Sequence, residues 1–343
     1  MLKRTSVIFA CLVLVAGFLA LKVFPKGEKL EEYKETRPYF GAYFTIDCRY
    51  DKKLTDIRAV TGECWRKLDV IQMNMNSESP MGYLGLINRS IPNAGVQVSD
   101  DLYVILHDAI EYSKWTGGAF DITVRPLVQL WKQAEAKNAL PTPEELDAVL
   151  GRTGSEYISL GSNNTVVLTK SGMKLDLNAI APAFAVDLVA RILTDHGIKH
   201  FMVDGSGEIS CKGDQPGQRG WRVGVHDPSG KNDGVSDILR LENVAVSTSG
   251  NYERYYVIAG QKYSHIIDPR TGRPANEVIS ATVIAPTAEE ANAYSTSLCV
   301  LGGKEGIKLV SDRKGVEALV VEKLDGETVS AETSKFRNYR APK

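Results

Sequence analysis

Two hydrophobic periods, one helical and one strand-like, run through this chain and limit the folds it can adopt. Apolar side chains recur at helical spacing over residues 54–75 and again after Ser99. From residue 199 onward, apolar and polar residues alternate as they do in half-buried strands. The two kinds of element mix without the strict alternation of a Rossmann sheet, and no GxGxxG motif follows a strand. The sequence therefore predicts an α+β fold.

Local patterns predict the remaining elements. Further helices are expected from residue 141, over 184–195, from Thr287 and over 304–313. Strands are expected over residues 43–50, 157–160, 165–169, 173–177, 199–204, 221–226, 237–241, 244–249, 253–259, 262–267 and 279–285, with a final pair near the C-terminus. Residues 76–98 are rich in Ser, Asn, Gly and Pro and predict an irregular loop.

The N-terminus carries the pattern of a membrane-targeting segment. Lys3 and Arg4 precede an apolar run over residues 7–21, which is typical of a signal peptide or an N-terminal anchor. No small-x-small cleavage site precedes Pro25, so residues 1–26 are predicted to be an uncleaved inner-membrane anchor. The leading positive charges predict that the rest of the protein lies on the periplasmic side. Secretion and lipidation at Cys11 are the alternatives.

The rest of the chain is predicted to be one domain with short flanks. Residues 27–36 are charged and lack an apolar period, which predicts a linker; residues 37–335 form the domain, and 336–343 a tail. A net charge of −1 without a basic cluster argues against a nucleic-acid partner. The domain's cysteines are Cys48, Cys64, Cys211 and Cys299. They form no CxxC pair, which argues against zinc or iron–sulfur centres and leaves one disulfide open.

Three glycine- or alanine-rich stretches are candidate ligand loops. In residues 117–127, two glycines allow close backbone approach and Asp121 can accept hydrogen bonds from an amino or ribose group; a helix cap and turn is the alternative. Residues 174–187 run from a predicted strand into a helix whose free amides favour anions such as pyrophosphate, or simply form a capped start with Pro182 in the first turn. Residues 203–209 end a strand in glycines, which form either a phosphate-binding concavity or a hairpin turn.

Two further stretches carry polar groups suited to catalysis. His265 is expected at the end of a strand beside a tight Asp-Pro-x-x-Gly turn, where a histidine acts as a general base or plays a structural role. Asn292 and Thr296 are four residues apart on the helix from Thr287 and so share one face. Two oxygens at that spacing can hold a hard cation, although both side chains are neutral, and a half-exposed polar face is the alternative.

Taken in order, these stretches resemble the ApbE family, the Mg²⁺-dependent FAD:protein FMN transferases. The matching segments are Gly-Ala-Phe-Asp-Ile-Thr-Val-x-Pro-Leu, Asp-Leu-x-x-Ile-Ala-x-x-x-Ala-Val-Asp, a glycine-rich strand end, Ser-Thr-Ser-Gly and Ser-His-Ile-Ile-Asp-Pro-x-Thr-Gly-x-Pro, within residues 36–333. The resemblance implies T-fold-like mixed sheets with packed helices. It also implies that FMN moves from FAD to a Thr or Ser hydroxyl with release of AMP. Typical acceptors are flavoprotein subunits of membrane redox complexes.

The resemblance also implies roles for individual residues, matched by motif. The positions that would contact FAD are Phe40, Asn76, Ala119, Phe120, Asp121, Asp176, Pro182, Gly205, Ser206 and Gly207. Ala179 would offer a backbone carbonyl to Mg²⁺, and Thr296 a hydroxyl. His265 matches the histidine proposed to deprotonate the acceptor hydroxyl.

Five positions depart from the family pattern. Phe40 stands where many members have Met, and Asn76 where many stack a Tyr on the flavin. Asn292 replaces an Asp of the Mg²⁺ site, which predicts weaker Mg²⁺ binding unless Glu208 or Glu289 restores the charge. Pro182 stands where many members have Lys, and Ala183 where many have Gly. Besides the transferase, two hypotheses therefore stay open. One is a catalytically impaired flavin-binding or scaffold protein, and the other an FAD pyrophosphatase that gives FMN and AMP.

Overall fold

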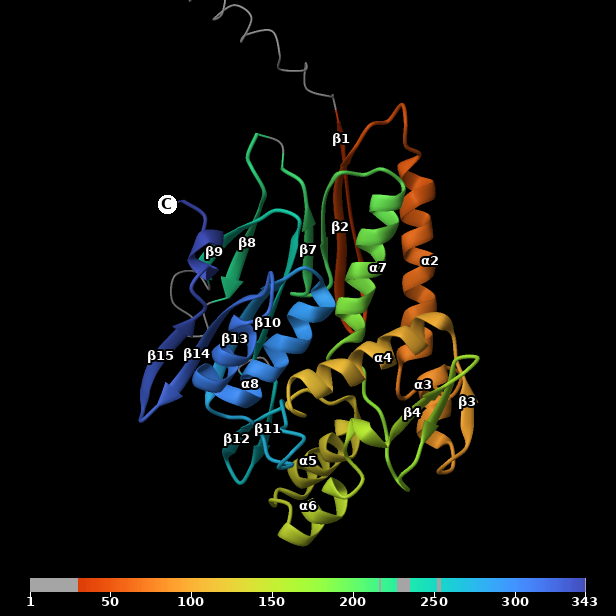
Figure 1. The fold of residues 1–343 in the computed structure, drawn as a ribbon, viewed down its shortest axis with the longest axis vertical. Helices are drawn as coiled ribbons and strands as arrows, with labels where there is room; N and C mark the ends of the chain where they lie inside the picture. The colour runs from red at the N-terminus through yellow and green to blue at the C-terminus, as the bar shows by residue number, and fades with distance from the viewer. Residues whose placement is uncertain (1–29, 216, 227–234, 252–253, 343) are drawn as a thin grey trace, which may run out of the picture.

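An eight-stranded antiparallel sheet forms the centre of the described chain, which comprises residues 30–215, 217–226, 235–251 and 254–342 of a computed structural model (Figure 1). In spatial order its strands are β1 (Glu31–Tyr39), β2 (Ala42–Tyr50), β6 (His200–Asp204), β7 (Ile209–Lys212), β10 (Val244–Gly250), β13 (Val278–Ala285), β14 (Glu317–Leu324) and β15 (Glu327–Glu332). Every neighbouring pair is antiparallel. This arrangement confirms the α+β prediction.

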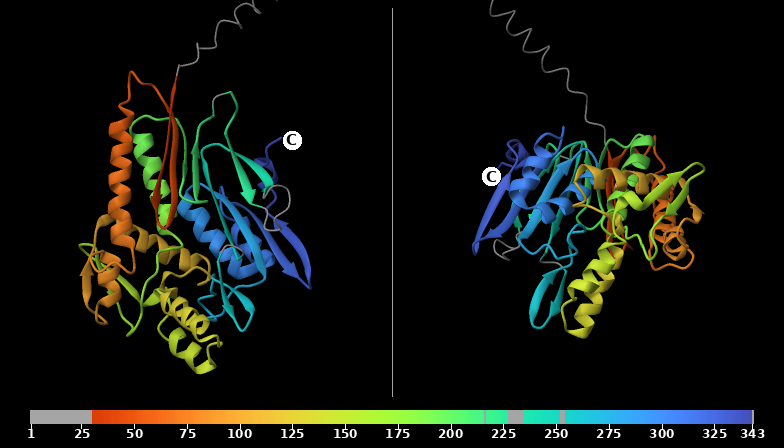
Figure 2. Two further views of the ribbon diagram at one scale, coloured as in Figure 1. Left: turned by 180° about the vertical axis from the view of Figure 1, so that it is seen from behind. Right: turned by 60° about the horizontal axis from the view of Figure 1, so that its bottom comes forward.

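Helices cover one face of the sheet and a small β-hairpin covers the other. The covering helices are α2 (Ile57–Met75), α7 (Ala181–Asp195) and α8 (Ala288–Ser311). The opposite face packs against β8 (Trp221–His226) and β9 (Val235–Leu241), with Trp221 fully buried between them and the sheet. Figure 2 shows the hairpin on the far side of the sheet from α7 and α8.

The remaining elements gather at one end of the molecule, at the bottom of Figure 1. They are α3 (Tyr83–Arg89), β3 (Gly95–Gln97), α4 (Asp100–Trp115), a 3₁₀ turn (Ile122–Val124), α5 (Arg125–Lys137), α6 (Pro143–Leu150), a 3₁₀ turn (Ser155–Tyr157), β4 (Ile158–Gly161), β5 (Thr165–Leu168), β11 (Tyr255–Ile258) and β12 (Gln261–Ser264). A separate core cluster, with Trp131 at its centre, joins α5 and α6 to β11 and β12.

Capping side chains set where the long helices begin. Asp56 accepts hydrogen bonds from the amides of Arg58 and Ala59 and starts α2, as Ser99 does for α4. Thr287 caps α8, and a non-helical Gly302 kinks it. The two helices predicted from Thr287 and over residues 304–313 therefore lie on either side of this break, within the single range Ala288–Ser311.

Strand β10 carries the alternation that positions the site. Ala245 belongs to the core cluster on the helix side, whereas Val246 packs toward the β8–β9 hairpin. With a period of two, Ser247 and Ser249 return to the helix side and face α8.

Both predicted flanks of the domain are partly wrong. Residues 31–36 of the expected linker lie in β1, an edge strand whose largely exposed side chains give no apolar period. The expected tail (336–343) begins with a 3₁₀ turn, Phe336–Tyr339, in which Phe336 is fully buried. One buried aromatic residue in a polar segment is too weak a pattern to predict packing.

Two internal predictions also need correction. Within the expected loop 76–98 lie α3 and β3, which are too short to show a clear hydrophobic period. Residues 173–177 are extended but form no ladder. The amide side chain of Asn88 bonds both backbone groups of Leu175, at 2.6 and 2.9 Å, and takes the place of a partner strand. Helix α5 and strand β7 were not predicted.

The predicted N-terminal segment (1–26), with Cys11, lies outside the described residues. Within the described part, no helix combines the length and hydropathy needed to cross a bilayer. The four domain cysteines are buried free thiols, so the disulfide that the sequence left open is not formed.

Candidate functional site

A buried cluster of hydroxyl and amide groups lies between α8 and β10. Asn292, Ser295 and Thr296 occupy one face of α8, as their spacing predicts. The Ser249 hydroxyl lies 2.8 Å from that of Ser295 and 3.4 Å from that of Thr296. Ser247 lies 3.3 Å from Ser295. The structure thus brings the two predicted cation ligands of α8 against the Ser-Thr-Ser motif of β10.

A carboxylate joins this cluster from the turn before β7. The Asn292 amide nitrogen donates to Glu208 Oε1 at 3.0 Å and approaches Ser247 Oγ at 3.4 Å. Asn292 is only 5% exposed, and its Oδ1 atom has no hydrogen-bond partner among the described residues. A buried amide oxygen left this way is costly unless a ligand satisfies it.

The donors present fit a hard cation such as Mg²⁺. They are amide, hydroxyl and carboxylate oxygens, which Mg²⁺ prefers, and the orphaned Asn292 Oδ1 is an available ligand atom. No group of three His, Cys, Asp or Glu side chains lies close enough in the described ranges to hold a metal. The charge at this cluster therefore comes from Glu208 rather than from several carboxylates.

Glu289, the other carboxylate considered from sequence, lies elsewhere. It is buried near Asp108 and Asp187, and burial, reinforced by those two negative charges, raises the pKa of Glu289 to about 9. Asp187 of α7 accepts the amide hydrogens of Ala288 and Glu289 at 2.9 Å each. Asp187 therefore joins α7 to the start of α8, and Glu289 is protonated at neutral pH.

The glycine-rich turn, Gly205–Gly207, is the hairpin between β6 and β7. The Gly205 amide donates to the Glu208 carbonyl, and Asp204 Oδ1 accepts from the amides of Ser206 and Gly207 at 2.9 Å. The turn also contacts the start of β2, because the Ser206 hydroxyl donates to the Tyr43 carbonyl at 2.7 Å. The hairpin alternative is therefore the observed one. Two of the amides expected to bind phosphate, those of Ser206 and Gly207, donate to Asp204 instead.

Gly205→Ala tests how closely this turn packs on α7. An added Cβ would lie 2.7 Å from Val186 Cγ2 and 3.3 Å from the Phe44 ring. We expect the variant to lose about 1–3 kcal/mol of unfolding free energy in urea, as overpacked cores do. Adding Val186→Ala should recover part of this loss. Equal stability of Gly205→Ala and the parent would contradict the packing described here.

The start of α7 is open to solvent beside this turn. Ala179 is exposed, Pro182 lies in the first turn of the helix, and Ile180 at the N-cap makes no side-chain capping bond. An uncapped N-terminus carries partial positive charge and suits a phosphate group. The Ile180 and Ala181 amides, however, donate to the Leu177 carbonyl, and Pro182 has no amide hydrogen, so the first turn offers an anion at most the Ala183 amide.

The 117–127 stretch and Asp176 meet at a second position. The Asp176 amide donates to the Ile122 carbonyl at 2.7 Å. Both Asp121 oxygens accept internal hydrogen bonds, from the Thr123 amide and hydroxyl, the Ser155 amide and the Ser113 hydroxyl. The structure therefore assigns Asp121 to holding the loop, instead of the predicted amino or ribose group. Ala119 and Phe120 are buried, and their amides donate to the carbonyl and hydroxyl oxygens of Thr116.

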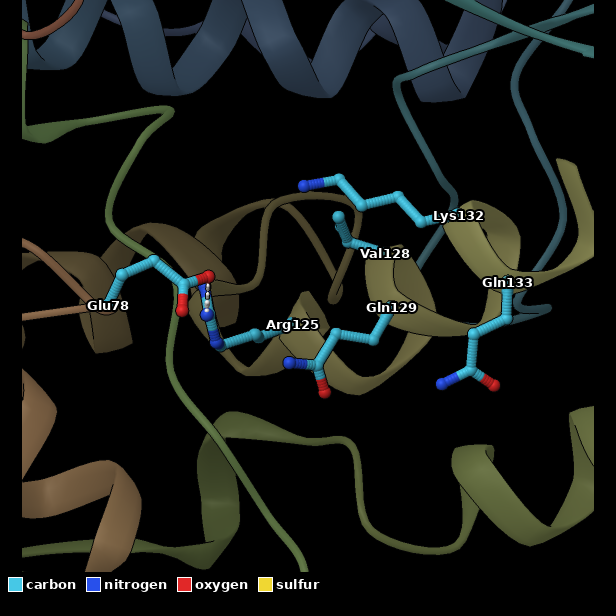
Figure 3. A pocket seen from close by; sticks show the side chains of 6 residues that line it. All are labelled: Glu78, Arg125, Val128, Gln129, Lys132 and Gln133. Atoms are coloured by element: carbon cyan, nitrogen blue, oxygen red, sulfur yellow. Dashed lines mark hydrogen bonds and ion pairs between the residues drawn. The ribbon is translucent and has the colours of Figure 1, made fainter. Parts of the chain in front are cut away.

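Arg125 links Asp176 to the segment after α2. Its guanidinium bonds Asp176 Oδ2 at 3.3 Å and contacts Ser77 and Glu78. Glu78 and Arg125 line a cavity of about 350 Å³ whose other walls come from α5 (Figure 3). The sequence alone predicts no role for Arg125, because its partners lie about 50 residues away in either direction.

Arg125→Met is expected to destabilise the fold by about 3 kcal/mol. The Arg125 and Asp176 side chains are 8% and 10% exposed, so removing the cation leaves a buried carboxylate. Glu78→Gln is the matched control, because Glu78 is 78% exposed and should cost under about 1 kcal/mol. Denaturant titration measures both; similar losses for the two variants would argue against a buried Arg125–Asp176 pair.

His265 lies at the end of β12, close to the turn that contacts α5. Its Nδ1 atom lies 2.9 Å from the Arg254 carbonyl oxygen, which can only accept, so Nδ1 carries the proton and Nε2 a lone pair. Burial lowers the pKa of His265 below its usual value. The neighbouring Ile266 packs in the same core cluster as Ala291 and Tyr294 of α8.

Phe40 and Asn76 occupy turns at the same end as α7's start. Phe40, with φ of 52°, forms the β1–β2 turn with Gly41, and its amide donates to Gln72 of α2 at 2.7 Å. Asn76 ends α2, is exposed, and accepts from the Glu78 amide through its side chain. Asn76 is followed directly by Ser77 and Glu78, the two residues that contact Arg125.

Sequence reasoning missed Ser247, Ser249, Ser295 and Arg125 as site residues. The signal for the serines was present: strand alternation places Ser247 and Ser249 on one face, and helical spacing places Ser295 beside Asn292. Joining the two faces requires knowing that α8 packs on β10.

Comparison with known proteins identifies the family. The ApbE family profile matches residues 40–320. The FAD:protein FMN transferase of Vibrio cholerae is 31% identical over 341 residues, which cover 98% of this chain and 99% of that protein. The structure of the flavin transferase ApbE from Vibrio cholerae has a TM-score of 0.80 at 30% identity and covers 90% of this chain and 99% of that one. The ApbE protein of Thermotoga maritima has a TM-score of 0.79 at 30% identity, covering 91% and 100%. The chain therefore belongs to the ApbE family.

Proposed function

We propose that the chain is an FAD:protein FMN transferase, which moves FMN from FAD to a Thr or Ser hydroxyl of an acceptor protein and releases AMP. The observation that carries the proposal is the buried oxygen cluster around Asn292. It lies beside the glycine-rich turn and the open start of α7, within a chain that matches FMN transferases over nearly its whole length.

His265 is the proposed general base. With its proton on Nδ1 facing the Arg254 carbonyl, Nε2 is free to take the proton of the acceptor hydroxyl. The hydroxyl oxygen then attacks the phosphorus of the FMN half of FAD. A phosphorus–oxygen bond to the acceptor forms while the bond from that phosphorus to the bridging oxygen breaks. AMP leaves with the bridging oxygen.

The residues proposed to hold Mg²⁺ are Asn292, Thr296 and the Ala179 carbonyl, together with Glu208. When bound, the cation would neutralise charge on the pyrophosphate. The start of α7 is proposed to face the same phosphates with the partial positive charge of its N-terminus, and Asp176 with the Ala119–Asp121 loop to bind another part of FAD.

The proposed setting is the outer face of a membrane. Residues 1–26 have the pattern of an inner-membrane anchor, and the leading Lys3 and Arg4 favour a periplasmic domain. We propose a flavin-accepting subunit of a membrane redox complex as the partner.

The test is covalent labelling of an acceptor. Full-length protein is incubated with FAD, Mg²⁺ and an acceptor that carries the target Thr, and flavin fluorescence is recorded in a denaturing gel. We expect a fluorescent acceptor band that requires FAD, and no band when the target Thr is replaced by Ala. Absence of a band with the intact acceptor would overturn the transferase proposal.

A further inference from the structure

The negative charge at the oxygen cluster comes from a different element than the ligands of α8. We propose that Glu208, at the end of the β6–β7 turn, is the anionic ligand of the cation site, and that Asn292 positions it through its amide nitrogen. This inference rests on the proposed function, because it concerns the cation that the transfer reaction would use.

Strand register brings Glu208 to this position. Ile209 pairs with Val246 across β7 and β10, and both pack on the hairpin side of the sheet. The preceding residue, Glu208, therefore lies opposite Ser247 and points to the helix side, because side chains alternate along a strand. The hydrogen bond from Asn292 to Glu208 agrees with this register.

The amide at position 292 complements a carboxylate at position 208. Asn292 Nδ2 donates to Glu208 Oε1 at 3.0 Å, while Asn292 Oδ1 stays buried without a partner among the described residues. The amide nitrogen of Asn292 thus holds the carboxylate, and the amide oxygen is available as a neutral ligand. An Asp at 292 would instead place two carboxylates in hydrogen-bond contact, and they would repel each other without a cation or a shared proton.

Three neighbouring carboxyl groups make hydrogen bonds at other positions or are protonated. Asp204 Oδ1 accepts from the Ser206 and Gly207 amides, and both Asp187 oxygens accept from the first amides of α8. Glu289 is protonated at neutral pH and lies beside Asp187. Glu208 is the carboxylate that the structure places in contact with Asn292.

Mn²⁺ binding measured by electron paramagnetic resonance tests this assignment without relying on turnover. Full-length protein is titrated with Mn²⁺ alone, and the loss of the free-ion signal gives the dissociation constant. Glu208→Gln keeps an oxygen that can accept from Asn292 but removes the charge, so we expect binding to weaken by at least about ten-fold. Glu277→Gln, at an exposed glutamate, is the matched control and should bind like the parent.

Moving the charge provides the sharper comparison. Glu208→Gln combined with Asn292→Asp returns one carboxylate to the cluster from α8, and we expect binding within about three-fold of the parent. Without Mn²⁺, Asn292→Asp alone should melt at a lower temperature than the parent. Adding Mn²⁺ should raise the melting temperature of this variant by more than it raises that of the parent. Parent-like binding by Glu208→Gln, or no Mn²⁺ binding by the parent, would overturn the assignment.

The acceptor-labelling gel separates this inference from the proposed function. A parent that labels the acceptor while Glu208→Gln binds Mn²⁺ normally would refute Glu208 as the anionic ligand and leave the transferase in place. A parent that follows the expected Mn²⁺ pattern but never labels the acceptor would refute the transferase and leave the cation site in place.

Discussion

Replacing His265 with alanine is expected to lower the rate of FMN transfer by a factor of roughly 10²–10⁴, the range lost when a general base is removed. The reason is the tautomer: Nδ1 faces the Arg254 carbonyl at 2.9 Å, so Nε2 is the atom that can accept a proton. Timed acceptor labelling gives the rate. FAD binding, measured by quenching of flavin fluorescence, should be unchanged, because His265 is proposed to act on the acceptor hydroxyl.

The pH profile gives His265 an independent readout. Burial lowers its pKa below the usual 6.5, so the neutral, active form persists at neutral pH and the rate should fall only in more acidic solution. This acidic limb should disappear in His265→Ala. His107→Ala, at an exposed position on α4, is the control and should keep both rate and profile. A parent-like rate for His265→Ala would remove the base from the mechanism.

Replacing Glu289 with glutamine is expected to remove a large pH dependence of stability. Burial raises the pKa of Glu289 from 4.5 to about 9, so the folded state holds a proton that the unfolded state has released between those values. The free energy of unfolding of the parent therefore falls as pH rises above 4.5. At pH 8 this penalty is on the order of 5 kcal/mol, and Glu289→Gln avoids it.

Urea titrations at several pH values test this expectation. The stability advantage of Glu289→Gln over the parent should be small near pH 4.5 and grow toward pH 8. Asp187, whose pKa burial raises from 3.8 to about 6, further lowers the free energy of unfolding of both proteins as pH rises between those two values. Glu327→Gln, at an exposed strand end, should follow the parent throughout. A constant difference between Glu289→Gln and the parent across the range would contradict a buried, protonated Glu289.

The buried carboxyl groups of Glu289 and Asp187 both lie at the start of α8. Glu289 lies in the first turn of α8, next to the amides that Asp187 caps, and Asn292 follows one turn later. Ionisation of Glu289 places a second negative charge beside Asp187. Alkaline pH should therefore destabilise the start of α8, the helix that carries Asn292 and Thr296.

Local patterns were enough to predict several elements and one face of the site. The stripe of α2, the Ser99 start of α4 and the shared face of Asn292 and Thr296 follow from helical spacing and capping alone. These features depend on residues a few positions apart, which is the range over which sequence periodicity carries information.

Features that depend on distant pairing were beyond such patterns. Glu208 reaches Asn292 only because β7 pairs with β10 in one register and α8 packs above them. Arg125 meets Asp176 across 51 positions, and Phe336 fills a core formed by β8, β9 and the sheet. Residues 31–36 form a strand because β2 lies beside them, although their own side chains are mostly exposed.

The most direct test of the central claim is the product balance of a single reaction. Full-length protein, FAD, Mg²⁺ and the acceptor are incubated together, and AMP, free FMN and acceptor-bound FMN are quantified. We predict one acceptor-bound FMN for each AMP released, with little free FMN. AMP accompanied mainly by free FMN would identify a pyrophosphatase, and FAD recovered unchanged would identify a flavin-binding or scaffold protein; either result would contradict the account.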